Sequence, residues 1–224
     1  MGQYRISELN LEILSNSKTL LTNLKPFETS FDYKPNLTLS ITDDILLQYM
    51  EEYEGYTADV IECVYLSTEF SRALFDFNGF SMESTAVEYE GSAVLFSAPF
   101  EDYQVYEKIS TDKVFSVDYP AIRLISSVFY AYGTPFGLNG DKVVDKKFPL
   151  KSIVFVDSER FDSLKVLDTK DMVSMFIRAV TKSIKSDRTK HTLFMLEKLM
   201  HKVKFYGVSD LSDLDFILER VTED

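Results

Sequence analysis

The sequence has no tryptophan, one cysteine and two histidines, and these shortages remove several kinds of chemistry. Cys63 stands alone, so the chain has no intrachain disulfide and no site built from several thiolates. We expect it to be a small apolar residue on a helix. His191 and His201 are ten positions apart on an expected helix, which directs them to different faces and away from a shared metal ion. The G-x-S-x-G turn of many hydrolases is also missing.

Positive charge is scarce as well. Lys and Arg number 24 against 36 Asp and Glu, which leaves a formal net charge of −12. Binding of nucleic acid depends on cations that neutralise phosphates, so the composition argues against nucleic acid and against anionic lipid surfaces as partners. No apolar run reaches the length of about 18 residues that a membrane span needs, and no basic segment followed by an apolar one opens the sequence. We expect a cytoplasmic protein without a membrane partner.

The most informative stretch covers residues 79–137. Two runs rich in β-branched and apolar residues, 83–88 and 92–97, flank Glu90-Gly91, and this pattern predicts a β-hairpin. The second run is almost continuously apolar, as in a strand that is covered on both faces and lies in the middle of a sheet. Nucleotide-binding α/β proteins place a glycine-rich loop after such a strand. Here residues 97–108 follow, and their sequence is not that of a phosphate loop.

The first quarter of the chain contains short strands and little regular structure besides. Alternation predicts a hairpin or bent strand over 4–14 and a strand over 36–41, whereas Pro26 and Pro35 favour an irregular segment over 20–35. The acidic residues of 43–54 lack the spacing and central glycine of a calcium loop and indicate a solvated acidic surface. We expect a small strand-rich N-terminal part over 1–56 and a main unit over 57–224, both within one compact protein.

The remainder of the chain alternates between helical and extended patterns. A helix is expected over 57–77, ended by Asn78-Gly79, with an aromatic stripe that belongs to the core. Short strands follow over 113–117, 121–125, 128–131 and 152–156. The last third is helical, with apolar stripes in 172–180, 193–203 and 211–221 and a late edge strand over 205–208. The fold class is therefore α/β.

Five sequence blocks, in order and spacing, resemble the small HPr kinase-like proteins. The blocks are Ser84-Thr85-Ala86-Val87, Ala93-Val94-Leu95-Phe96-Ser97-Ala98-Pro99 after Gly91, Val117-Asp118-Tyr119-Pro120-Ala121-Ile122, Tyr130-Ala131-Tyr132-Gly133-Thr134-Pro135-Phe136, and Pro149-Leu150-Lys151-Ser152-Ile153-Val154-Phe155. The likeness extends from about residue 4 to residue 221. It implies the P-loop fold of HPr kinase and phosphoenolpyruvate carboxykinase: a mixed sheet with helices, a small strand-rich N-terminal part and a helical C-terminal third.

The chain departs from this family where nucleotide would bind. Members carry a Ser-Gly-x-Gly-Lys-Ser/Thr segment after Ala-Pro, but here Pro99 is followed by Phe100, Glu101 and Asp102, and no glycine occurs between Gly91 and Gly133. Without glycine the backbone does not readily form a nest for phosphate, and proline has no N–H to offer. A carboxylate about 5 Å from a phosphate is repelled by about 3 kcal/mol at an effective dielectric near 20, roughly a hundredfold in affinity.

Other family positions are also changed. A histidine of the family is replaced by Glu83, and a pair of carboxylates is reduced to Asp118. These two residues are the weak candidates for metal binding or acid–base chemistry, and together with Glu101 and Asp102 they form either a carboxylate cluster at the strand ends or a solvated acidic surface. The resemblance also implies a ligand pocket at Tyr132, Gly133, Thr134, Pro135 and Phe136.

These observations lead to two hypotheses on function. The first is a catalytically inactive HPr kinase-like protein that acts as a binding or regulatory module for a protein or peptide, with no nucleotide, cofactor or metal. The second is an enzyme, a kinase or phosphotransferase, with a rebuilt phosphate or peptide-substrate site. The second needs a convergent positive charge, and Lys108, Lys113, Arg123 and Lys142 are the nearest candidates in the sequence.

Overall fold

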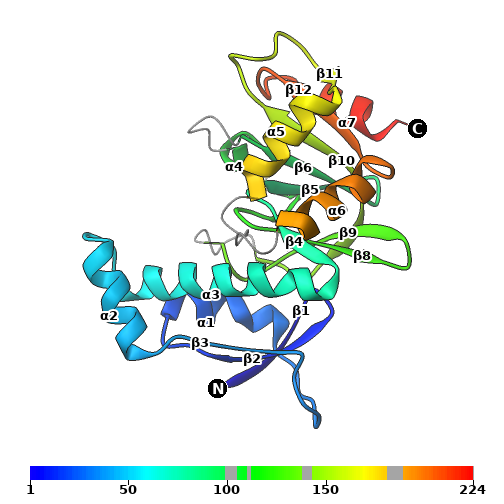
Figure 1. Cartoon of the computed structure of the whole chain (residues 1–224). Helices are drawn as coiled ribbons and strands as arrows, with labels where there is room; N and C mark the ends of the chain where they lie inside the picture. The colour runs from blue at the N-terminus through cyan, green and yellow to red at the C-terminus, as the bar shows by residue number, and fades with distance from the viewer. Residues whose placement is uncertain (99–104, 110–111, 138–142, 181–188, 224) are drawn as a thin grey trace.

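The computed structural model describes residues 1–98, 105–109, 112–137, 143–180 and 189–223. Its elements form a mixed α/β protein in which a small N-terminal sheet adjoins a larger, curled mixed sheet (Figure 1). Within the described residues, no helix combines the length and the apolar character that a membrane crossing requires. The α/β class expected from the sequence is confirmed.

The N-terminal unit consists of a three-stranded sheet and the helical segments that adjoin it. Its strands are β1 (Gly2–Ile6), β2 (Leu9–Leu14) and β3 (Leu37–Ser40), in that spatial order. Its helical segments are α1 (Lys18–Leu24), the 3-10 turn η1 (Lys25–Phe27), α2 (Asp43–Glu52) and α3 (Ala58–Leu74), which continues into η2 (Phe75–Phe77). The hairpin over 4–14 is confirmed, but the expectation of an irregular segment over 20–35 is wrong for its first part, because residues 20–27 lie in α1 and η1. The acidic residues of α2 and of the turn after it are exposed, in agreement with the expected acidic surface.

The helices of this unit begin at side-chain caps. Ser17 accepts a hydrogen bond from the Leu20 N–H, and Thr57 accepts one from the Val60 N–H, which satisfies backbone donors that have no partner inside the helix. The expected long helix is confirmed as α3 and η2. Its last residue is followed by Asn78 in the left-handed conformation (φ 54°), so Asn78 rather than Gly79 makes the turn into the next strand.

The larger sheet runs in the order β4-β8-β9-β10-β6-β5-β7, with β12 beside β10 and β11 beside β12. Its strands are β4 (Gly79–Ser81), β5 (Thr85–Tyr89), β6 (Ser92–Ser97), β7 (Val114–Ser116), β8 (Ala121–Ile125), β9 (Val128–Tyr132), β10 (Lys147–Val156), β11 (Lys165–Val166) and β12 (Lys204–Val208). The β5–β6 hairpin is confirmed, and Glu90 and Gly91 both have positive φ. The expectation that β12 is an edge strand is wrong, because β11 pairs with its outer side.

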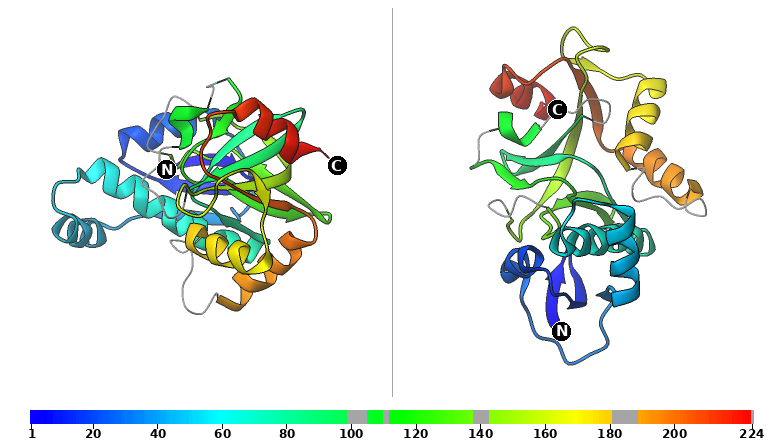
Figure 2. Two further views of the ribbon diagram at one scale, coloured as in Figure 1. Left: turned by 90° about the horizontal axis from the view of Figure 1, so that it is seen from above. Right: turned by 90° about the vertical axis from the view of Figure 1, so that its left-hand side faces the viewer.

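Helices cover both faces of the central strands β6 and β10 (Figure 2). The helices are α4 (Val105–Lys108), α5 (Thr169–Val180), α6 (Thr189–Met200) and α7 (Leu214–Thr222). Leu95 and Phe155 belong to the core cluster shared with α5 and α6, whereas Phe96 and Val154 belong to the cluster shared with α7. The continuous apolar run of β6 is thus explained by two cores, one on each face.

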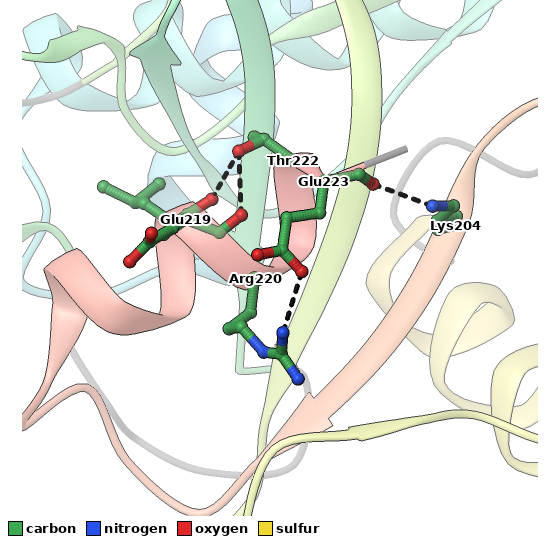
Figure 3. Close-up of polar contacts among 6 residues, drawn as sticks. Lys204, Glu219, Arg220, Thr222 and Glu223 are labelled. Carbon is green, nitrogen blue, oxygen red and sulfur yellow. Dashed lines mark hydrogen bonds and ion pairs between the residues drawn. The ribbon is translucent and has the colours of Figure 1, made fainter.

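Polar contacts fasten the end of α7 to the neighbouring strand (Figure 3). Lys204, the first residue of β12, donates a hydrogen bond of 2.8 Å to the carbonyl oxygen of Glu223. Arg220 and the Glu223 carboxylate form an ion pair, also at 2.8 Å, and the Thr222 hydroxyl bonds back to the carbonyl oxygens of Leu218 and Glu219. The carbonyl group of Glu219, which is one of the last four of the helix, therefore has a side-chain partner where a helix end leaves carbonyl groups unpaired.

The contact between α3 and the loop after β9 provides a test of the core. Phe70 is 1% exposed and its ring lies 4.8 Å from that of Phe136. Phe70→Ala should lower the free energy of unfolding by about 3 to 5 kcal/mol, because it removes a buried ring and leaves a cavity. Phe194→Ala is the matched control, since Phe194 also lies on a helix but is 49% exposed. Chemical denaturation of the two variants measures the difference, and equal losses would contradict the packing described here.

Candidate functional site

The candidate site lies at the C-terminal end of β6, where the family resemblance places phosphate binding. The last residue of the strand, Ser97, is fully buried, and its hydroxyl donates a 2.6 Å hydrogen bond to the carbonyl oxygen of Glu83. The next residue, Ala98, is the last one described before the gap at 99–104. The predictions made for Pro99, Phe100, Glu101 and Asp102 therefore lie outside the described residues.

The backbone brings the two weak catalytic candidates, Glu83 and Asp118, together at this end of the sheet. The N–H of Ser84 donates to the carbonyl oxygen of Asp118 at 3.0 Å, and the N–H of Glu83 donates to the carbonyl oxygen of Ala179 in α5. The Glu83 side chain is exposed and that of Asp118 is half-buried. Asp118 also adopts a left-handed backbone (φ 66°), which few residues other than glycine, asparagine and aspartate accept. The backbones of Glu83 and Asp118 thus lie close to the end of β6, and the Asp118 carboxylate lies beside Gly137.

The basic residues that could offset these carboxylates have other contacts. Lys113 pairs with Asp215 at 3.2 Å and lies over the ring of Tyr89. The Arg123 guanidinium donates to the carbonyl oxygens of Ser7 and Phe77, and its burial lowers its pKa. Lys108 is exposed on α4, and Lys142 lies outside the described residues. Lys113 and Arg123 therefore contact groups in other parts of the protein.

The predicted pocket residues Tyr132, Gly133, Thr134, Pro135 and Phe136 form the junction between the main sheet and the N-terminal unit. All five are buried. The Tyr132 hydroxyl donates to the Glu8 carboxylate at 3.0 Å, and the Thr134 hydroxyl donates to the carbonyl oxygen of Tyr119, also at 3.0 Å. A Cβ on Gly133 would lie 2.0 Å from the carbonyl oxygen of Val144. These residues contact other parts of the protein, and a ligand pocket among them stays a prediction.

Charged groups at the junction shift one another's pKa. Burial raises the pKa of the Tyr132 phenol, and the nearby Glu8 carboxylate adds to this effect. The hydrogen bond from Lys147 lowers the pKa of Glu8, which keeps that carboxylate ionised. A phenol that stays protonated can only donate to the carboxylate, so the contact between Tyr132 and Glu8 is maintained across the neutral pH range.

The hydrogen bonds of Asn23 at this junction are not predicted by the sequence. Asn23 lies in α1, within the segment expected to be irregular, and its buried side-chain amide donates to the carbonyl oxygens of Pro135 at 3.0 Å and Gly137 at 2.9 Å. The partners are more than 110 positions away in the chain. No local pattern signals such a pairing, although a buried asparagine must find partners of this kind.

The thiol of Cys63 and the imidazoles of His191 and His201 lie in different surroundings and do not form a common site. Cys63 is fully buried in α3, and burial, followed by the nearby Asp59 carboxylate, raises the pKa of its thiol to about 12. His191 packs edge-on against Phe75, whereas His201 is exposed after the end of α6. Within the residues that the structure describes, no three His, Cys, Asp or Glu side chains are grouped so that they could hold a metal ion.

Comparison of the chain with protein-family models finds no match, and comparison with curated proteins finds none either.

The junction can be tested through Asn23. Asn23→Ala should lower the free energy of unfolding by about 2 kcal/mol, because two buried carbonyl groups lose their donor. Asn23→Asp should be more destabilising at neutral pH, since an ionised carboxylate would face two carbonyl oxygens, and the loss should shrink as the pH falls and the carboxyl group is protonated. Denaturation at neutral and acidic pH measures both effects. A pH-independent loss for Asn23→Asp would contradict the pairing.

Cys63 should be inert in the folded protein. A buried thiol with a pKa near 12 has almost no thiolate at pH 8, and the thiolate is the reactive form. A chromogenic disulfide reagent should therefore modify Cys63 only after addition of denaturant. Ser163→Cys in a Cys63→Ala background places a thiol at an exposed position and gives the rate for an accessible group. Equal rates for the two proteins would show that Cys63 is accessible after all.

Proposed function

We propose that the chain is a degenerate HPr kinase-like protein that has lost nucleotide binding and phosphotransfer and serves as a binding or regulatory module for a protein or peptide. The observation that carries this proposal is the chemistry at the end of β6. The segment after the strand has neither the glycines nor the lysine of a phosphate loop, and Glu83 and Asp118 lie close to the strand end. Negative charge there opposes a nucleotide, which is itself an anion.

The contacts of the neighbouring basic residues support the proposal. Lys113 and Arg123, which could have supplied a rebuilt phosphate site, pair with Asp215 and with backbone carbonyl groups. Sites that hold transferring phosphates depend on positive charge or metal ions placed against the phosphate oxygens. On this proposal, the blocks shared with the family pack the core of this chain, and the chemistry of the family is lost.

The alternative is an enzyme with a rebuilt phosphate or peptide-substrate site. The observation that favours it is the convergence of Glu83 and Asp118, with Asp118 in a left-handed conformation. Such conformations are common at functional sites, although aspartate also adopts them for structural reasons. In this case the carboxylate of Asp118 would act as a base or as a magnesium ligand.

A thermal-shift titration separates the two functions. The protein is heated with magnesium and ATP, ADP, GTP or pyrophosphate, with calcium as a control cation. A ligand present at a hundred times its dissociation constant stabilises a protein by about 2.7 kcal/mol, a shift of roughly 2 to 4 °C for a chain of this size. We expect no shift. A magnesium-dependent shift, together with nucleotide turnover that Asp118→Ala abolishes and Asp162→Ala retains, would favour the enzyme.

A further inference from the structure

The second helix, α2, extends from the rest of the protein and buries none of its own residues. It lies at the outer end of α3, away from the larger sheet (Figures 1 and 2). Thr42 caps its first turn, and Tyr49 attaches it to α3 through an edge-on contact with Tyr65 at 5.6 Å. The helix is therefore held in place by one face, and the opposite face is open.

The open face of α2 is apolar at its centre. Leu47 and Met50 are 59% and 39% exposed and are separated by three positions, so they lie on one side of the helix. Tyr53, which follows the helix, stacks on Tyr49 with 5.9 Å between ring centroids and so belongs to the attached side. Met is enriched at the centres of protein interfaces. We call the surface formed by Leu47 and Met50 the α2 face.

Acidic residues surround the α2 face. Residues 35–71 contain eight Asp or Glu and no Lys or Arg. Asp59 and Glu62 accept hydrogen bonds from the backbone of Lys18 and Asn16, and Glu69 pairs with Arg72. The other five are the acidic residues of α2 and the turn after it, namely Asp43, Asp44, Glu51, Glu52 and Glu54.

These five carboxylates are not neutralised by the protein. Among the described residues, no ion pair involves any of them. Asp43 and Glu51 are four positions before and after Leu47, so they lie on the same side of the helix as the apolar centre. An apolar centre with a rim of one charge sign has the anatomy of an interface for an oppositely charged partner.

We propose that the α2 face docks a basic protein segment with apolar anchors, in which Lys or Arg residues flank a stripe of large apolar side chains. A second copy of this chain would bring acidic rims together, and an anionic membrane would be repelled for the same reason. A basic segment instead gains from charge and from apolar burial together. The proposal rests on the binding role proposed above for the existence of a partner, but it does not depend on whether nucleotide binds.

The probe is a synthetic amphipathic helix of leucine and lysine, with leucines at i, i+3, i+4 and i+7 spacing, labelled for fluorescence anisotropy. A scrambled peptide of the same composition has the same charge but no apolar stripe. We expect the patterned peptide to bind at least about tenfold more tightly than the scrambled one. Binding should weaken between about 0.1 M and about 1 M salt, over which the Debye length falls from about 10 Å to about 3 Å.

Two pairs of variants locate the binding site. Leu47→Ala with Met50→Ala removes the apolar centre and keeps the helix propensity of α2 high, and we expect a loss of at least about tenfold in affinity. Leu193→Ala with Phe194→Ala is the matched control, because these residues are similarly exposed on α6. Glu51→Lys with Glu54→Lys should also weaken binding, whereas Glu159→Lys with Asp162→Lys, which changes the net charge equally, should not.

The outcomes separate this proposal from the previous one. Equal effects of the α2 and control variants, or no binding of the patterned peptide, overturn the docking surface and leave the nucleotide result untouched. Concentration-dependent dimerisation that Leu47→Ala with Met50→Ala abolishes, measured by sedimentation, would identify a second copy as the occupant and also overturn it. Retained secondary structure and melting temperature in each variant show that lost binding does not reflect unfolding.

Discussion

The parallel pairing of β6 with β10 is the contact on which the rest of the structure depends. Leu95 pairs with Ile153 and Phe96 with Val154, and all four side chains are fully buried. One face of this pair forms the core with α5 and α6, and the other forms the core with α7. β10 also pairs with β9 through its first residues and with β12 through its last. Both cores and both halves of the sheet therefore meet at these two strands. Packing on both faces of β6 thus fixes the position of Ser97, its last residue.

The junction with the N-terminal unit is fastened by polar groups as well as by apolar packing. Asn23 donates to the loop after β9, Arg123 donates to the turn between β1 and β2, and Glu8 of that turn accepts from Tyr132. Buried polar groups of this kind are stable only when each finds a partner. The Tyr-Gly-Thr-Pro-Phe block that resembles the HPr kinase-like proteins therefore has a structural explanation in this chain, whether or not a ligand also binds there.

The parts of the fold with a strong local signal could be predicted from the sequence. The hairpin at Glu90-Gly91 has its turn residues, and α3 has its periodic stripe and its ending at Asn78. The short helix α1 was missed because packing of Leu20 and Leu24 in the core, rather than propensity, stabilises it. The sequence predicts β12 as an edge strand, because its outer partner β11 has only two residues and is too short to be recognised as a strand. At the candidate site, the sequence identified Glu83 and Asp118 through the resemblance, but it could not pair Asn23 with Pro135, since local patterns carry no information on contacts between distant segments.

A single property, the excess of acidic residues, connects the two proposals. At the end of β6 it opposes an anionic ligand, and around α2 it favours a cationic one. The apolar residues of α2 need a separate explanation, because a helix with no buried residue adds little to the free energy of folding. Leu47 and Met50 are largely exposed, so polar residues in their place would change the stability of the chain little. Exposed apolar groups that lie together favour association. Leu47 and Met50 are therefore better explained by a surface that is covered in a complex than by the stability of the isolated chain.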